Sequence, residues 1–171
     1  WYDRYPWDSM TLKEVELAIV DRMAELIAAD GQPLAGVFEI ISMFEQQGLK
    51  LAVASSSNLR LIEAVLHKFE IYNRFEVVHS AEFEAYGKPH PSVFISAAKQ
   101  LNVAPTNCLV FEDSIGGMTA AKAARMVCVV VPENIHRSLP QFGLADLNLH
   151  SLLAFTPDHL NQINASLFCF S

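Results

Sequence analysis

Two adjacent carboxylates, Glu112 and Asp113, follow the apolar run 109–111 and precede the sequence Ser-Ile-Gly-Gly. The apolar run predicts a buried strand, and the glycines with the helix-favouring residues 119–124 predict a sharp turn followed by a helix. Ligands bind at the carboxyl ends of strands in open α/β sheets. Two acids there suit a hard cation such as Mg²⁺, which prefers oxygen ligands. The ordinary alternative is that both carboxylates face water and cap the helix.

A run of hydroxyl side chains, Ser55 to Ser57, ends a second predicted strand and is followed by Asn58. Hydroxyls and free backbone N–H groups at the start of a helix form a site for an anion, because the helix N-terminus carries partial positive charge. The alternative is that Ser57 or Asn58 is an ordinary helix cap. The two readings are compatible, since one residue can cap the helix while Ser55 faces a phosphate.

The third candidate is Lys88, in the loop Gly-Lys-Pro-His-Pro at 87–91. Both Lys88 and His90 precede a proline, which disfavours helical geometry and stiffens the loop. A stiff loop that presents one lysine suits a fixed positive charge directed at a phosphate. The alternative is a solvated loop lysine, and His90 is more simply a loop or cap residue than a catalytic base.

The elements between these residues alternate in type. A capping box, Thr11 with Glu14, predicts the start of a first helix. Apolar periodicity predicts helices at 12–29, 37–47, 59–69 and 91–101 and from 156 onward, and strands at 49–54, 75–78, 109–111, 127–131 and 147–149. Strands that alternate with helices indicate parallel βαβ units and hence a Rossmann-like α/β fold.

The composition excludes several classes of function. The chain has 171 residues, 51% of them hydrophobic, and a formal net charge of −7. Without a basic stripe, nucleic acid and anionic membranes are poor partners. The scattered Cys108, Cys128 and Cys169 indicate reduced thiols of a cytoplasmic protein. We expect a monomer that binds a small-molecule phosphate ester.

Taken together, these motifs resemble the haloacid dehalogenase superfamily, in the branch of β-phosphoglucomutases and of 2-deoxyglucose-6-phosphate and hexitol phosphatases. The matching segments are 33–37, 51–57, 87–91 and 111–117, in the expected order and spacing. The resemblance implies that residues 1–31 are the C-terminal part of a helical cap and that residues 32–171 form the α/β core.

The resemblance also implies a role for each candidate residue. Ser55 and Ser56 would hold the phosphoryl group, and Lys88 would bridge the phosphate and the nucleophile as a catalytic residue. Asp113 would ligate Mg²⁺, with Glu112 helping directly or through water. The implied activity is Mg²⁺-dependent hydrolysis of small sugar or polyol phosphates through an aspartyl-phosphate.

One departure from the family is large: the chain has no DxDG segment, which carries the nucleophilic Asp on the first strand of the family's sheet. None of its early aspartates, Asp3, Asp8, Asp21 and Asp30, has a second Asp two residues later. We therefore expect a core without its first strand, inactive by itself, in which strands 49–54 and 109–111 do not pair. The alternatives are a sugar phosphomutase and a non-catalytic remnant that binds phosphate.

Overall fold

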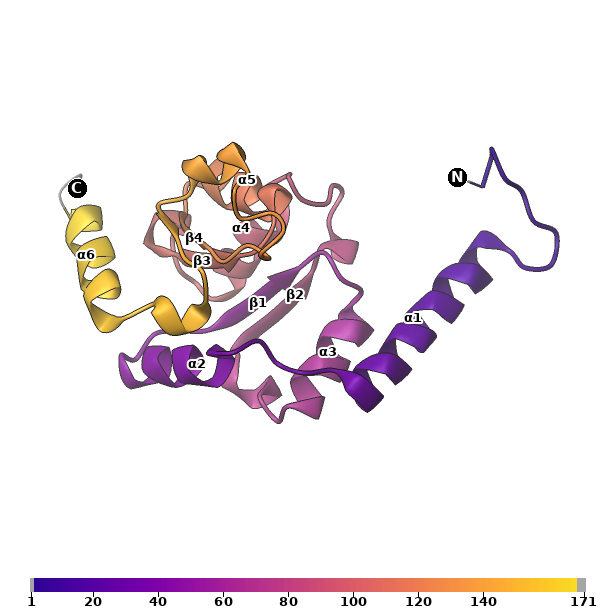
Figure 1. Cartoon of the computed structure of the whole chain (residues 1–171), viewed down its shortest axis with the longest axis horizontal. Helices are drawn as coiled ribbons and strands as arrows, with labels where there is room; N and C mark the ends of the chain where they lie inside the picture. The colour runs from indigo at the N-terminus through magenta and orange to yellow at the C-terminus, as the bar shows by residue number, and fades with distance from the viewer. Residues whose placement is uncertain (1, 169–171) are drawn as a thin grey trace.

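A computed structural model describes residues 2–168. Within this range, five parallel strands form two sheets (Figure 1). One sheet pairs β1 (Ala52–Ser55) with β2 (Val77–Ser80), and the other has the order β3 (Leu109–Glu112), β4 (Val127–Val130) and β5 (Leu147–Asn148). The expected Rossmann-like α/β architecture with parallel strands is confirmed.

The helices are α1 (Leu12–Asp30), α2 (Val37–Gln46), α3 (Leu59–Lys68), α4 (Ser92–Gln100), α5 (Ile115–Ala123) and α6 (Pro157–Phe168). Side chains close the start of several of them. Thr11 and Glu14 form the predicted capping box of α1, Asn58 accepts from the N–H of Arg60 at the start of α3, and Ser114 caps α5.

Helices cover both faces of the strands, so the core has three layers. Alternate residues point to opposite faces, as the strand geometry requires: Ala54, Val110 and Cys128 pack with α4 and α5, while Val53 and Phe111 pack with α2, α3 and α6. These two apolar clusters span both sheets. The two sheets therefore form one strand layer between two layers of helices.

The strands β1 and β3 are not paired with each other in the described residues, because they lie in separate sheets. This is the arrangement expected from the missing DxDG segment. That a strand of the complete protein lies between them stays a prediction. Lys88 spans the interval instead, with its Nζ 3.1 Å from the carbonyl oxygen of Ala54 in β1 and ion-paired with Glu112 in β3.

Some predicted boundaries were wrong. The first strand begins at Ala52 rather than 49, and the second covers 77–80 rather than 75–78, because the ladder starts at the pair Ala52 and Val77. Helix α5 begins at Ile115, so both glycines lie in its first turn and not in a preceding turn. The Ser114 hydroxyl accepts from the N–H of Gly117 at 3.0 Å, which stabilises the helix start despite the low helix propensity of glycine.

Helix α1 projects from the body of the molecule and packs on α3 (Figure 1). Lys68 joins the two helices by donating to the carbonyl oxygens of Ile27 and Ala28. Only Val20 of α1 is buried, whereas Leu12 and Ile19 are each 55% exposed. The assignment of 1–31 to a cap remains a prediction, and none of the helices within 2–168 combines the length and apolar character needed to span a bilayer.

Candidate active site

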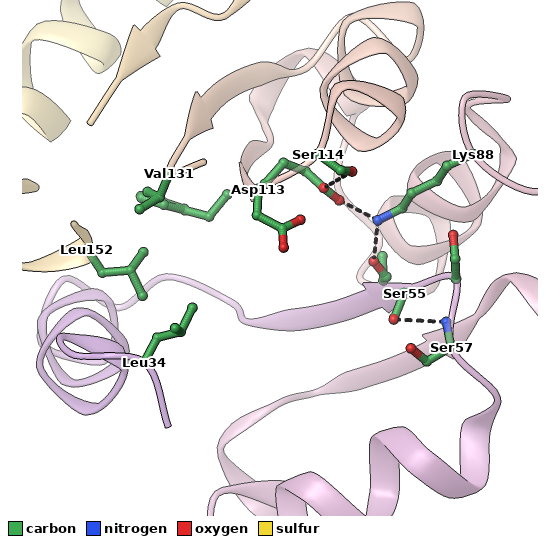
Figure 2. A pocket seen from close by; sticks show the side chains of 12 residues that line it. Leu34, Ser55, Ser57, Lys88, Asp113, Ser114, Val131 and Leu152 are labelled. Carbon is green, nitrogen blue, oxygen red and sulfur yellow. Dashed lines mark hydrogen bonds and ion pairs between the residues drawn. The ribbon is translucent and has the colours of Figure 1, made fainter. Parts of the chain in front are cut away.

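The predicted site residues meet around one cavity at the carboxyl ends of β1 and β3 (Figure 2). The cavity has a volume of about 470 Å³. All five predicted residues line it: Ser55, Ser56, Lys88, Glu112 and Asp113. The fold thus brings together, at one edge of the strand layer, side chains that are separated by up to 58 positions in the sequence, as expected when ligands bind at the carboxyl ends of parallel strands.

Lys88 is a positioned lysine and not a solvated one. Its side chain is 12% exposed and forms an ion pair with Glu112. The Nζ atom donates to the carbonyl oxygen of Ala54 and lies 4.5 Å from the centre of the Phe94 ring. The ammonium group therefore lies at the cavity and is held there by two protein acceptors. A charge that is already fixed in position needs little reorganisation to bind an anion.

Glu112 and Asp113 are adjacent in sequence but differ in environment. The Glu112 carboxylate is 8% exposed, pairs with Lys88, and accepts from the Ser114 hydroxyl at 3.2 Å. Asp113 is exposed, points into the cavity (Figure 2), and has no hydrogen-bond partner among residues 2–168. The two carboxylates therefore do different work: Glu112 is held in place by protein groups, and Asp113 is available to a ligand.

Asp113 is the side chain that best fits a hard cation. Mg²⁺ commonly takes one or two carboxylates from the protein and completes its octahedron with water and substrate phosphate. Asp113 could supply the first carboxylate, and Glu112 lies next to it with both oxygens already bonded. These are the two carboxylates that line the cavity, and Mg²⁺ usually keeps several waters beside one or two carboxylates. The described part of the chain holds no cluster of three or more His, Cys, Asp or Glu residues.

The segment Ser55 to Ser57, here called the hydroxyl loop, uses some of its side-chain hydrogen bonds on its own backbone. Ser55 Oγ accepts from the N–H of Ser57 at 3.1 Å, and Asn58 is the residue that caps α3. Sequence reasoning missed Ser80, which is fully buried and donates from Oγ to the carbonyl oxygen of Ser57 at 2.7 Å. Ser80 thereby fixes the hydroxyl loop from the neighbouring strand β2, a contact that only the register of the sheet reveals.

His90 acts as a helix-start residue, as predicted. Its Nδ1 lies 3.3 Å from the backbone nitrogen of Ser92, the first residue of α4. The Ser92 hydroxyl also contacts this ring nitrogen.

The described thiols do not supply a nucleophile. Burial, with the nearby charges of Glu112 and Asp146, raises the pKa of Cys128 to about 12. Burial also raises the pKa of Cys108. Both remain protonated at neutral pH, and a protonated thiol is a poor nucleophile; Cys169 lies outside the described residues.

Gly117 is a site residue whose importance is visible only in three dimensions. A Cβ at this position would lie within 2.5 Å of three atoms of the Glu112 carboxyl group, whereas a Cβ at Gly116 meets no atom within 4 Å. Glycine at 117 therefore leaves the space in which the Glu112 carboxylate lies, against the N-terminus of α5, where a negative charge is favourable.

We predict that Gly117→Ala moves the Glu112 carboxylate and weakens its pairing with Lys88, lowering turnover of the full-length protein about tenfold, which is 1.4 kcal/mol. Alanine is a better helix former than glycine by up to about 1 kcal/mol. In Gly117→Ala, the displacement of the Glu112 carboxylate therefore offsets this gain in helix stability. Gly116→Ala is the matched control and should raise the melting temperature without affecting turnover. Equal turnover in both variants would show that the position of Glu112 is unimportant.

The family is decided by comparison with known proteins. The model of the haloacid dehalogenase-like hydrolases matches residues 4–125. The chain belongs to this family. The resemblance drawn from the motifs is thus confirmed, as is its placement near the hexitol phosphatase and β-phosphoglucomutase branch.

Two relatives of this hydrolase illustrate the branch. Hexitol phosphatase B of Escherichia coli (strain K12) is 39% identical over 160 residues, which cover 94% of this chain and 72% of the relative. The putative phosphatase YhcW of Bacillus subtilis (strain 168) is 38% identical over 133 residues, which cover 75% of this chain and 60% of the relative.

Solved structures of the family agree with the fold. CbbY from Rhodobacter sphaeroides, solved in complex with phosphate, superposes with a TM-score of 0.80 at 27% identity and covers 90% of this chain and 71% of its own. The β-phosphoglucomutase of Clostridium difficile superposes with a TM-score of 0.76 at 25% identity, covering 92% of this chain and 66% of its own.

Proposed function

We propose that the complete protein is a Mg²⁺-dependent phosphatase that hydrolyses small sugar or polyol phosphates through an aspartyl-phosphate. The observation that carries the proposal is the convergence of the Ser55 loop, the Lys88 ammonium and the free Asp113 carboxylate on one cavity. The 39% identity to hexitol phosphatase B supports the substrate class. Cys108 and Cys128, the two cysteines within the described residues, are free thiols, which supports a cytoplasmic location.

Each residue has a defined part in this proposal. The hydroxyl of Ser55 and the backbone N–H of Ser56 would bind the phosphoryl oxygens. Lys88 would neutralise charge on the transferring group, and Asp113, assisted by Glu112, would hold the metal. The bound Mg²⁺ would polarise the phosphoryl oxygens as a Lewis acid. In such transfers, positioned charges contribute most of the rate enhancement.

The nucleophile is proposed to come from outside this chain as printed, on a strand that inserts between β1 and β3. The facing edges of these strands make no ladder with each other among residues 2–168, and unpaired backbone groups in a core are costly. Leu34, Val131 and Leu152 line the cavity on the side away from Lys88 (Figure 2). They would pack against apolar residues of the inserted strand.

A screen of phosphate esters with the full-length protein tests the proposal. We expect Mg²⁺-dependent release of inorganic phosphate from hexose or hexitol 6-phosphates, and no release when EDTA removes the metal. Interconversion of sugar 1- and 6-phosphates without release would establish a phosphomutase instead. Binding of phosphate without turnover of any ester would identify a non-catalytic phosphate-binding protein.

A further inference from the structure

A hydrogen-bonded pair, His79 with Glu84, lies outside the cavity, at the end of β2. His79 Nε2 is 2.7 Å from Glu84 Oε1, and the two side chains are 12% and 13% exposed. The other ring nitrogen, Nδ1, lies 3.1 Å from Nε2 of Gln100 in α4. Hydrogen bonds from Ser96 of α4 and from His79 hold the pKa of Glu84 below its ordinary value. Glu84 is therefore an ionised carboxylate whose side chain is 13% exposed, held by hydrogen bonds with His79 and Ser96.

The pair closes a turn that leads into the Lys88 loop. Residues Ala81–Phe83 form one turn of 3-10 helix, and Glu84 folds back across it to reach His79, five positions earlier. The next residues, Ala85, Tyr86 and Gly87, are exposed. Glu84 is thus the last side chain before Lys88 that is not exposed, on the N-terminal side of the loop.

The same pair is aligned with the backbone atom that receives Lys88. His79 stands opposite Ala54 in the ladder between β2 and β1, and the Ala54 carbonyl oxygen accepts from Lys88 Nζ at 3.1 Å. The paired residues His79 and Ala54 therefore fix both ends of this arrangement. His79 bonds Glu84 at the start of the loop, and the Ala54 carbonyl oxygen accepts from the lysine of the loop. Moving Glu84 would shift the origin of the loop relative to that acceptor.

Stability alone is a weak explanation for this pair. Removing a carboxylate and an imidazole largely from water costs desolvation free energy. Apolar side chains of similar size commonly give the folded state equal or greater stability. Loss of one partner, by contrast, leaves a poorly solvated polar group without its bond. A buried pair of this kind is suited to holding one defined geometry.

We propose that Glu84 and His79 are positioning residues that hold the Lys88 loop in register with β1 and so place the ammonium group in the phosphate cavity. The bracing of the loop stands on the contacts described above. Its effect on turnover rests on the proposed function.

Amide hydrogen exchange across 85–88 tests the bracing directly in the full-length protein. Glu84→Ala and His79→Ala should each speed exchange in this loop about tenfold, because they lower the free energy of local opening. Glu84→Gln retains a carbonyl oxygen that can accept from His79 and should have a smaller effect. Glu45→Ala is the matched control, since it breaks the Arg74–Glu45 ion pair on another part of the surface. Unchanged exchange at 85–88 in both the Glu84 and His79 alanine variants would overturn the proposal.

Kinetic coupling tests the link to Lys88. Glu84→Ala should lower kcat about tenfold or more, since displacement of a catalytic group by 1 Å can cost about 10²-fold, and should change KM less. In a Lys88→Ala background the same substitution should have no further effect on kcat, because the group that it positions has been removed. An equal loss in both backgrounds would show that Glu84 acts on the fold in general and would overturn the positioning role.

The two proposals fail in distinguishable ways. If the wild type hydrolyses no phosphate ester, the proposed function is wrong, while hydrogen exchange at 85–88 still decides whether the pair braces the loop. If Lys88→Ala abolishes turnover and Glu84→Ala changes neither turnover nor exchange, the phosphatase stands and the positioning role is refuted.

Discussion

Replacing Lys88 by Met should lower kcat/KM of the full-length protein about 10²- to 10³-fold, the range seen when one donor to a developing oxyanion is removed. Methionine retains much of the side-chain length and the packing against Phe94, which the ammonium group faces at 4.5 Å, but removes the charge. The loss therefore measures electrostatic stabilisation of the phosphoryl group rather than packing. Phosphate release under saturating and subsaturating ester gives the values of kcat and KM.

A second variant separates two causes of this loss. Without Lys88, the Glu112 carboxylate, which is 8% exposed, would remain as an unpaired charge that repels phosphate. The double variant Lys88→Met/Glu112→Gln removes that charge. Because Glu112 also assists the metal in the proposal, the single variant Glu112→Gln is the reference. If Lys88 binds phosphate, the double variant should be about 10²- to 10³-fold less active than this reference; if Lys88 only neutralises Glu112, the two variants should be equally active.

The matched control for Lys88 is Lys50→Met. Lys50 is 49% exposed and its Nζ lies 3.8 Å from Glu76, on the surface, and surface pairs contribute little. Its kcat/KM should stay within about twofold of the wild type, well under the tenfold change that corresponds to 1.4 kcal/mol. A loss below tenfold in Lys88→Met as well would refute the catalytic assignment.

Asp113→Asn should remove most Mg²⁺-dependent turnover, by about 10²-fold or more, because a metal at a phosphoryl oxygen contributes several kcal/mol. Asparagine keeps the size of the side chain and one oxygen but loses the negative charge. Asp113 makes no hydrogen bond to residues 2–168, so the free energy of unfolding without metal should change little. Turnover measured against Mg²⁺ concentration gives the apparent affinity.

Thermal unfolding supplies a measure of the metal that does not depend on turnover. Mg²⁺ at a hundred times its Kd stabilises the folded state by about 2.7 kcal/mol through mass action. We expect this stabilisation in the wild type and in the control Asp30→Asn, an exposed residue at the end of α1, and its loss in Asp113→Asn. Equal stabilisation of all three proteins would place the metal elsewhere.

Local sequence determined most of the elements and the membership of the site. The capping box at Thr11 and Glu14 set the start of α1, since it needs only residues three positions apart. Hydroxyls, a lysine and two acids after three successive strands were enough to place all five candidate residues at one cavity. This worked because parallel strands bring their carboxyl ends to the same edge.

Other features were decided by tertiary structure. The glycines of the acidic motif predicted a turn, yet both lie in α5, because the Ser114 hydroxyl satisfies the N–H of Gly117. The apolar stripe of α1 marks one side of the helix as apolar, but Val20 is the only buried residue of α1 and Ile19 is 55% exposed, although the helix packs on α3. Periodicity tells which side of a helix is apolar and carries no information about what covers it.

The division of work between Glu112 and Asp113 also depended on tertiary structure. The residue types alone presented two adjacent acids, and only the family resemblance gave them different roles. The fold supplies the physical difference, because it bonds Glu112 to Lys88, which is 24 positions away, and leaves Asp113 directed into the cavity. The same holds for the contact of Ser80 with Ser57 and for the anchoring of Glu84 by His79. Composition and spacing determine which groups a strand end can offer. Which of them pair and which stay free depends on the register between β1 and β2 and on the packing of α4 and α5, because pairing requires side chains from different elements to arrive within about 3 Å of one another.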